Sequence, residues 1–184
     1  MKVFRKAFLY KITKEKEKSM IYQRILPEGW YDEEISYNME QINNAWQNGE
    51  IMQGRVMKCD SSYNLHINLG NNIEGIIPRD EVEAVSINDI GFPKPNICTS
   101  KLNKYVQFRV KNIDNDKVIL SRKSVGKEVI RWINSEVQVG DVVNGIIKNI
   151  RPYGVFVEVG GGIVRSITHR RYICRKNKKS NRTI

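Results

Sequence analysis

An internal repeat, with a period of about 90 residues, is the feature that most constrains the fold. Residues 63–70 (Tyr-Asn-Leu-His-Ile-Asn-Leu-Gly) and residues 153–160 (Tyr-Gly-Val-Phe-Val-Glu-Val-Gly) match position for position. The glycine that ends each segment lies 16 residues after Gly54 in the first copy and 15 residues after Gly145 in the second. Apolar residues alternate with polar ones in both segments, which is typical of a strand with one buried face. The sequence therefore predicts two copies of one small β domain.

The first copy reads as five short strands. A long connection, roughly residues 80–103 with two prolines, separates the third strand from the fourth. Three strands, a long connection and two further strands are typical of a small Greek-key barrel. We therefore predict a mainly β fold with a closed five-stranded barrel, whose strands are expected at residues 54–59, 64–69, 73–78, 106–111 and 117–122.

A helical pattern precedes each copy. In residues 32–48 the apolar side chains Ile35, Met39, Ile42 and Trp46 follow at three- and four-residue steps. This spacing predicts an amphipathic N-terminal helix that ends at Asn48-Gly49. A similar stripe, made by Val125, Val129, Trp132, Ile133 and Val137, predicts a linker helix. The expected organisation is an arm and helix at 1–48, the barrel at 49–123, the linker helix at 124–138, an incomplete second repeat at 139–164 and a disordered basic tail at 165–184.

Motifs in both copies resemble the ribosomal S1-type RNA-binding domain, a family of the oligonucleotide-binding (OB) fold. They are Val-Gly-Asp-Val-Val-Asn-Gly-Ile-Ile (139–147), Pro-Tyr-Gly-Val-Phe-Val-Glu-Val-Gly (152–160), Ile-Glu-Gly-Ile-Ile-Pro (73–78) and Val-Ile-Leu-Ser-Arg-Lys (118–123). The tandem arrangement is similar to ribosomal-protein-S1-like proteins of bacteria. The resemblance implies binding of single-stranded RNA (mRNA), a cytoplasmic role in translation or mRNA handling, and the small ribosomal subunit as a candidate partner.

Aromatic side chains at outward strand positions are the main candidate RNA contacts. In the second copy Val155, Val157 and Val159 are expected inside the barrel, which leaves Phe156 and Glu158 outside. Gly154 could let the strand coil enough to bring Tyr153 beside Phe156. A base stacked on such a ring contributes about 1–3 kcal/mol. The alternative is that these rings pack against the linker helix or the neighbouring domain.

The first copy has a poorer platform. Tyr63 is retained, but His66 stands where the second copy has Phe156, and Pro78 stands where the family usually has histidine. Basic residues could line a phosphate track, although outward lysines and arginines are often only solvated surface. We expect this copy to bind RNA weakly or to contact proteins. The basic candidates are Arg79, Arg109, Lys111 and Lys117.

The net charge of +11 is weak support for nucleic-acid binding, because it sits at the two ends. Residues 1–30 carry +5 and residues 165–184 carry +8, while the stretch between them carries −2. Basic tails attract polyanions without sequence preference.

The third strand of the second copy is expected after Val164, but residues 165–174 depart from the family pattern. One allowed set of codons for them, read one base later, encodes Gly-Leu-Leu-His-Ile-Glu-Asp-Ile-Ser, which fits that strand. We therefore hypothesise a frameshift near Arg165, which the nucleotide sequence tests. A barrel with two strands and part of a third leaves open edges. The second repeat is therefore expected to be incomplete and marginally stable, with residues 168–184 disordered.

Residues able to support catalysis or metal binding are sparse. The only histidines are His66 and His169, and Cys59 lies seven residues from His66 without a second pair at zinc spacing. We expect no enzyme activity, no metal and no cofactor. No apolar run is long enough to span a bilayer, and three widely spaced cysteines indicate a reducing cytoplasm rather than a disulfide framework. The rival function is a protein-contact module that docks on the ribosome or on an RNA-processing complex.

Overall fold

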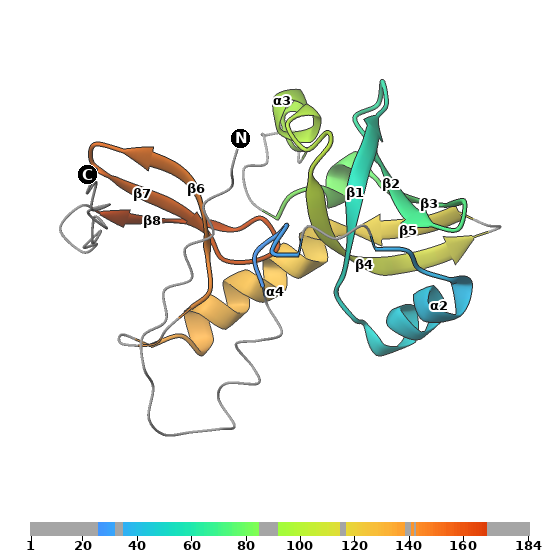
Figure 1. Ribbon diagram of the computed structural model, residues 1–184, viewed down its shortest axis with the longest axis horizontal. Coiled ribbons are helices and arrows are strands. Elements are labelled where there is room, and N and C mark those ends of the chain that lie inside the picture. The colour runs from blue at the N-terminus through green and yellow to red at the C-terminus, as the bar shows by residue number, and fades with distance from the viewer. Residues whose placement is uncertain are drawn as a thin grey trace, which may run out of the picture.

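The computed structural model describes residues 26–31, 35–84, 92–114, 117–138, 141 and 143–168. The arm before residue 26 and the tail after residue 168, which includes His169, lie outside the described residues. Figure 1 shows a barrel at one end, a separate sheet at the other, and a long helix that runs between them.

The first repeat is a closed five-stranded barrel, as predicted. Its strand order is β1-β2-β3-β5-β4, and β1 pairs with β4 to close the ring. β3 and β5 are parallel, and the other pairs are antiparallel. The strands are β1 Met52–Cys59, β2 Leu65–Gly70, β3 Ile73–Ile77, β4 Tyr105–Asp114 and β5 Lys117–Ser121.

The barrel interior is filled by the apolar half of each alternating strand. Leu65, Ile67 and Leu69 are fully buried on β2, in the alternation that the sequence predicted. Strand β1 approaches β2 so closely at Gly54 that an added Cβ would overlap the side chain of Ile67. This interior fixes the barrel through burial of apolar area.

Helix α2 (Met39–Asn48) covers one end of the barrel but begins later than residue 32. The side chain of Asn38 accepts a hydrogen bond from the Gln41 backbone, and Gln41 bonds back to Asn38, so the helix is capped there. Ile42 and Ala45 are buried. Met39 and Trp46, which we expected on the buried stripe, are 37% and 41% exposed. The long β3–β4 connection holds the 3-10 turn η1 (Arg79–Glu81) and helix α3 (Pro95–Thr99).

Helix α4 (Arg122–Ser135) is the predicted linker helix, and it starts directly where β5 ends. Ser121 caps it by accepting a hydrogen bond from the Ser124 backbone. Val129 and Trp132 pack against Val159 and Ile163 of the second repeat. Val159, which we expected to fill a barrel, therefore packs against α4. In the described part of the chain no helix is long and apolar enough to cross a membrane.

The second repeat is an open three-stranded sheet with the order β6-β7-β8. β8 (Val164–Thr168) pairs with β7 (Gly154–Glu158), and β7 pairs with β6 (Ile146–Arg151). A third strand thus stands at residues 165–168, where we expected a tail; the frameshift near Arg165 stays a hypothesis. On the face that is interior in the first repeat, Ile147 and Ile150 are 48% and 62% exposed, whereas Val155 is buried and Val159 packs against α4. Within the described ranges, no fourth or fifth strand joins this sheet.

Candidate nucleic-acid interface

Two aromatic rings meet at the start of β7. Tyr153 is 67% exposed, and its ring lies edge-to-face on Phe156, with centroids 6.2 Å apart and planes at 89°. A Cβ on Gly154 would press on the carbonyl oxygen of Ile167, so only glycine lets β8 approach β7 this closely. The residues expected to form a ring pair are therefore neighbours, and the outer ring is open to solvent.

The corresponding residues of the first repeat have other partners. The guanidinium of Arg79 lies 5.0 Å from the Tyr63 ring centre, so Arg79 covers a ring rather than pointing freely to solvent. The imidazole of His66 lies 2.6 Å from the Glu74 carboxylate and 3.4 Å from that of Asp60. Two carboxylates beside His66 oppose the approach of a phosphate.

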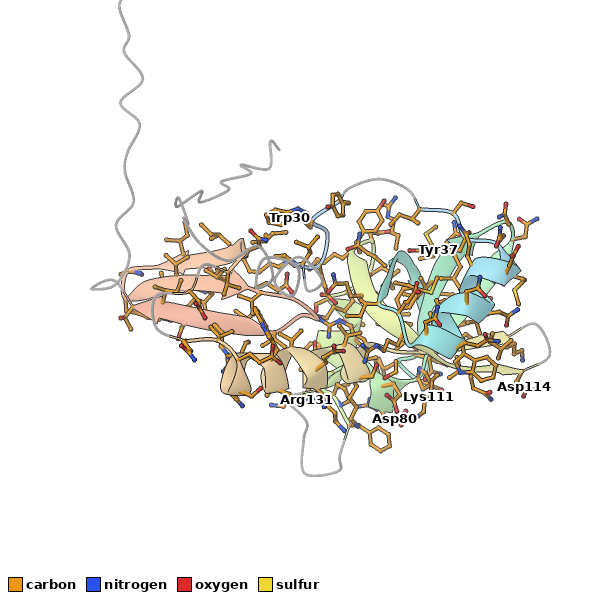
Figure 2. The ribbon with its side chains drawn as sticks, turned by 90° about the horizontal axis from the view of Figure 1, so that it is seen from below. Trp30, Tyr37, Asp80, Lys111, Asp114 and Arg131 are labelled. Carbon is orange, nitrogen blue, oxygen red and sulfur yellow. The ribbon has the colours of Figure 1, made fainter. Side chains whose placement is uncertain are left out.

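The basic candidates do not line one continuous track. Arg109 forms an ion pair with Glu128, and Lys111 lies 2.6 Å from a carboxylate oxygen of Glu81. Lys117 starts β5 and lies opposite Asp114 in the β4–β5 ladder, and Figure 2 labels Lys111 and Asp114 at different points along β4. Arg109 and Lys111 instead line a cavity of about 330 Å³ together with Lys123 and Lys127. Among the described residues, no group of three His, Cys, Asp or Glu side chains could hold a metal ion.

A buried polar cluster joins the two repeats. Glu28 lies in a segment (26–31) that crosses α4 between the barrel and the second sheet (Figure 1). Its carboxylate accepts two hydrogen bonds from Arg122, at 2.7 and 2.9 Å, and both side chains are buried. Arg122 also donates to the carbonyl of Val82 at 2.8 Å and lies 2.9 Å from Glu83. Burial alone would raise the pKa of Glu28, but the Arg122 charge and hydrogen bonds hold it below its usual value.

Glu158 completes this cluster and corrects a prediction. We expected it to face outward, but it is 1% exposed. Its carboxylate accepts backbone hydrogen bonds from Glu28, Gly160 and Gly162, at 2.8, 2.8 and 3.1 Å. Burial and the nearby Glu28 charge raise the pKa of Glu158 to about 7.

The residue of the first repeat that is equivalent to Glu158 is Asn68, and the two side chains share one local contact. In the first copy the side chain of Asn68 accepts a hydrogen bond from the Gly70 backbone at 2.9 Å. Glu158 makes the equivalent bond to Gly160 at 2.8 Å. The second oxygen of Glu158 then receives the N–H of Glu28. In the second copy, the residue that makes the local turn contact therefore also binds the N-terminal segment.

Sequence reasoning missed this cluster and also Phe92. The guanidinium of Arg79 lies 5.6 Å from the Phe92 ring centre. Two signals were available: the acidic residue in Pro-Glu-Gly-Trp (27–30) and the glycine triplet at 160–162. Neither motif indicates which residues it contacts in the folded chain. Phe92 lies within the long connection between the third and fourth strands, whose sequence has neither strand nor helix periodicity, so no pattern indicated a role for it.

Comparison with known proteins places these features in a family context. The family model described as the S1 RNA binding domain matches residues 46–123 and 136–184, more than half of the chain. Small ribosomal subunit protein bS1 of Leuconostoc lactis is 31% identical, over 69% of this chain and 31% of its own length. The bS1 protein of Rhizobium meliloti is 25% identical over 70% of this chain and 26% of its own length. That of Staphylococcus aureus is 22% identical over 79% and 35%. The chain thus spans about a quarter to a third of the length of these curated relatives.

Proposed function

This chain belongs to the S1 RNA binding domain family, and on that premise we propose that it binds single-stranded RNA through the ring pair Tyr153–Phe156. The bound group is an unpaired base that stacks on the outer ring. The first repeat contributes a weaker second contact. The role is binding rather than catalysis.

The observation that carries this proposal is the exposed tyrosine on an aromatic support. Tyr153 is 67% exposed, although burying its ring would be favourable, and Phe156 holds it in an edge-to-face contact. A ring held in this way loses little conformational freedom when a base stacks on it. Stacking on a π-face tolerates any base, because every base has one. The geometry therefore supports sequence-tolerant binding.

The test is a titration of the full chain against a labelled single-stranded oligonucleotide of about ten nucleotides, a length within the usual range for an OB fold. Tyr153→Leu and Phe156→Leu should each weaken binding by about five- to 150-fold, the equivalent of 1–3 kcal/mol. Tyr31→Leu is the matched control, because Tyr31 is also an exposed tyrosine, at 56%. A duplex of the same sequence should bind more weakly.

Undiminished binding by both ring variants would refute the proposed platform. If that binding also disappeared at high salt, only the electrostatic attraction of the basic termini would remain. The two outcomes are separated by repeating the titration at two salt concentrations.

The partners we propose are mRNA and the small ribosomal subunit, since the relatives carry the name small ribosomal subunit protein bS1. A cytoplasmic location accords with the free thiols of Cys59 and Cys98. Co-sedimentation of the chain with purified small subunits, with and without mRNA, tests the ribosomal part separately from RNA binding.

A further inference from the structure

Three side chains form a layered stack at one edge of the first repeat. The guanidinium of Arg79, in η1, lies 5.0 Å from the ring centre of Tyr63 and 5.6 Å from that of Phe92. Both distances are within the range of a cation–π contact. The three residues come from the β1–β2 turn, from η1 and from the connection that leads to α3. The stack therefore gathers aromatic surface that no single strand supplies.

Local hydrogen bonds hold the stack in place. Tyr63 has a φ of 65°, a left-handed conformation that a non-glycine residue adopts only at a cost in free energy. Its N–H donates to the carbonyl of Asp60 at 3.0 Å. The Arg79 backbone donates to the Asn64 side chain at 3.0 Å, and its guanidinium donates twice to the Pro93 carbonyl, at 2.8 and 3.1 Å. Strain kept at one aromatic residue is a sign of a functional constraint.

The strand position that carries Phe156 in the second repeat cannot play the same part here. His66 occupies it, and only 19% of its side chain is exposed, between the carboxylates of Asp60 and Glu74. Phe92, by contrast, is 39% exposed while its ring rests on Arg79. Of the two rings that contact Arg79, that of Phe92 is the exposed one, because Tyr63 is partly buried.

We propose that Phe92 is the outer stacking surface of the first repeat for an unpaired nucleobase, supported from below by Arg79 and Tyr63. This inference rests on the proposed RNA binding and names the contact residue of the first repeat. The positive charge of Arg79 within the stack also attracts the RNA backbone. Arg79 then acts mainly by supporting a ring, rather than as one member of a phosphate track.

The test uses the full chain and the labelled single-stranded oligonucleotide, with and without Tyr153→Leu. Phe92→Leu keeps an apolar side chain but removes the π-face, and it should weaken binding by about fivefold or more, the lower end for a stacked base. Phe92→Tyr should restore the affinity. Met57→Ala is the control, because Met57 is a 54% exposed apolar residue of the same repeat.

The outcomes separate this inference from the proposed function. If Tyr153→Leu weakens binding but Phe92→Leu leaves the affinity within about twofold, the assignment of Phe92 is overturned and RNA binding stands. If the unmodified chain fails to bind, both are overturned. A loss of affinity in Phe92→Leu that Phe92→Tyr does not restore also contradicts stacking. An unchanged urea midpoint in each variant shows that the affinity differences are not caused by unfolding.

Discussion

The carboxylate of Glu28 and the guanidinium of Arg122 form a two-point ion pair across 94 residues of sequence. Arg122 is 1% exposed and Glu28 is 7% exposed. Arg122 begins the linker helix, and Glu28 donates its backbone N–H to Glu158 of the second repeat. One buried cation therefore ties the N-terminal segment, the barrel and the second sheet together.

Removing one partner of this pair should be strongly destabilising. Arg122→Met leaves the buried carboxylate of Glu28 without its ion-pair partner and leaves Glu83 with Lys101 alone, so we expect a loss of about 3–5 kcal/mol in the free energy of unfolding. Urea denaturation measures it. Arg131→Met, at an exposed position of the same helix (Figure 2), should change stability by less than about 0.5 kcal/mol. Equal losses in the two variants would contradict a special role for the pair.

Gly162 tests how closely the second repeat packs on this cation. Gly162 and Gly49 both have left-handed φ values, of 72° and 63°. A Cβ at Gly162 would overlap the guanidinium of Arg122, whereas a Cβ at Gly49 meets nothing within 4 Å. Both alanine variants therefore share the backbone strain of about 1–2 kcal/mol. Gly162→Ala should cost a further 1–3 kcal/mol or so because Arg122 must move. Similar urea midpoints for the two variants would argue against this contact.

The two repeats offer a matched pair of isoleucines. Ile77 in β3 pairs with Leu65, and Ile167 in β8 pairs with Val155, which is the equivalent of Leu65 in the second copy. Ile77 is fully buried, but Ile167 is 38% exposed on the open sheet. Ile77→Ala should therefore cost about 2–5 kcal/mol, and Ile167→Ala less than about 1 kcal/mol. Denaturant midpoints compare the two. A large loss in Ile167→Ala would mean that the side chain of Ile167 is covered in solution.

Stability should fall as the pH rises towards neutrality. Glu158 has a pKa of about 7 in the folded chain, raised by burial and by the Glu28 charge, against an ordinary value of 4.5. Between these two values the folded state holds a proton that the unfolded state has released. The stabilisation is therefore complete below about pH 4.5 and is lost as the pH passes 7, with a total of at most about 3 kcal/mol. Glu28 has a lowered pKa, so its own contribution changes only at lower pH.

Urea titrations between pH 5 and pH 8 measure this dependence. Glu158→Gln should flatten the decline, because the glutamine amide does not titrate in this range. Glu50→Gln, at an exposed carboxylate, should leave the slope of the original chain in place. If the stability of Glu158→Gln and of the unmodified chain fell in parallel, Glu158 would not be the titrating group.

Much of the first repeat could be predicted from its sequence. The alternation of Leu65, Ile67 and Leu69 sufficed to predict the buried face of β2, because strand periodicity is a local property. The start of α2 was wrong by seven residues, since apolar spacing does not show which polar residue caps the helix. Asn38 caps the helix, so the apolar residue before it, Ile35, does not belong to the helix, and the predicted helix was too long at its N-terminus.

The candidate site was predictable only in part. Tyr153 and Phe156 were expected to be neighbours because they share a turn and a strand. The partners of Arg109 and Lys111 could not be foreseen, because Glu128 and Glu81 come from other elements. Local pattern identifies a cation but not the carboxylate that reaches it in space.

The amino-acid sequence alone determined two copies of a β unit, the inward residues of the first barrel and the ring pair on the second. Tertiary structure decided what lies against each outward face. Glu158 shows the difference, because alternation correctly places it on the opposite side from Val155 and Val157, yet that side is covered by Glu28 and its segment. A period of two specifies the side of a sheet, whereas burial depends on chain segments that are distant in sequence.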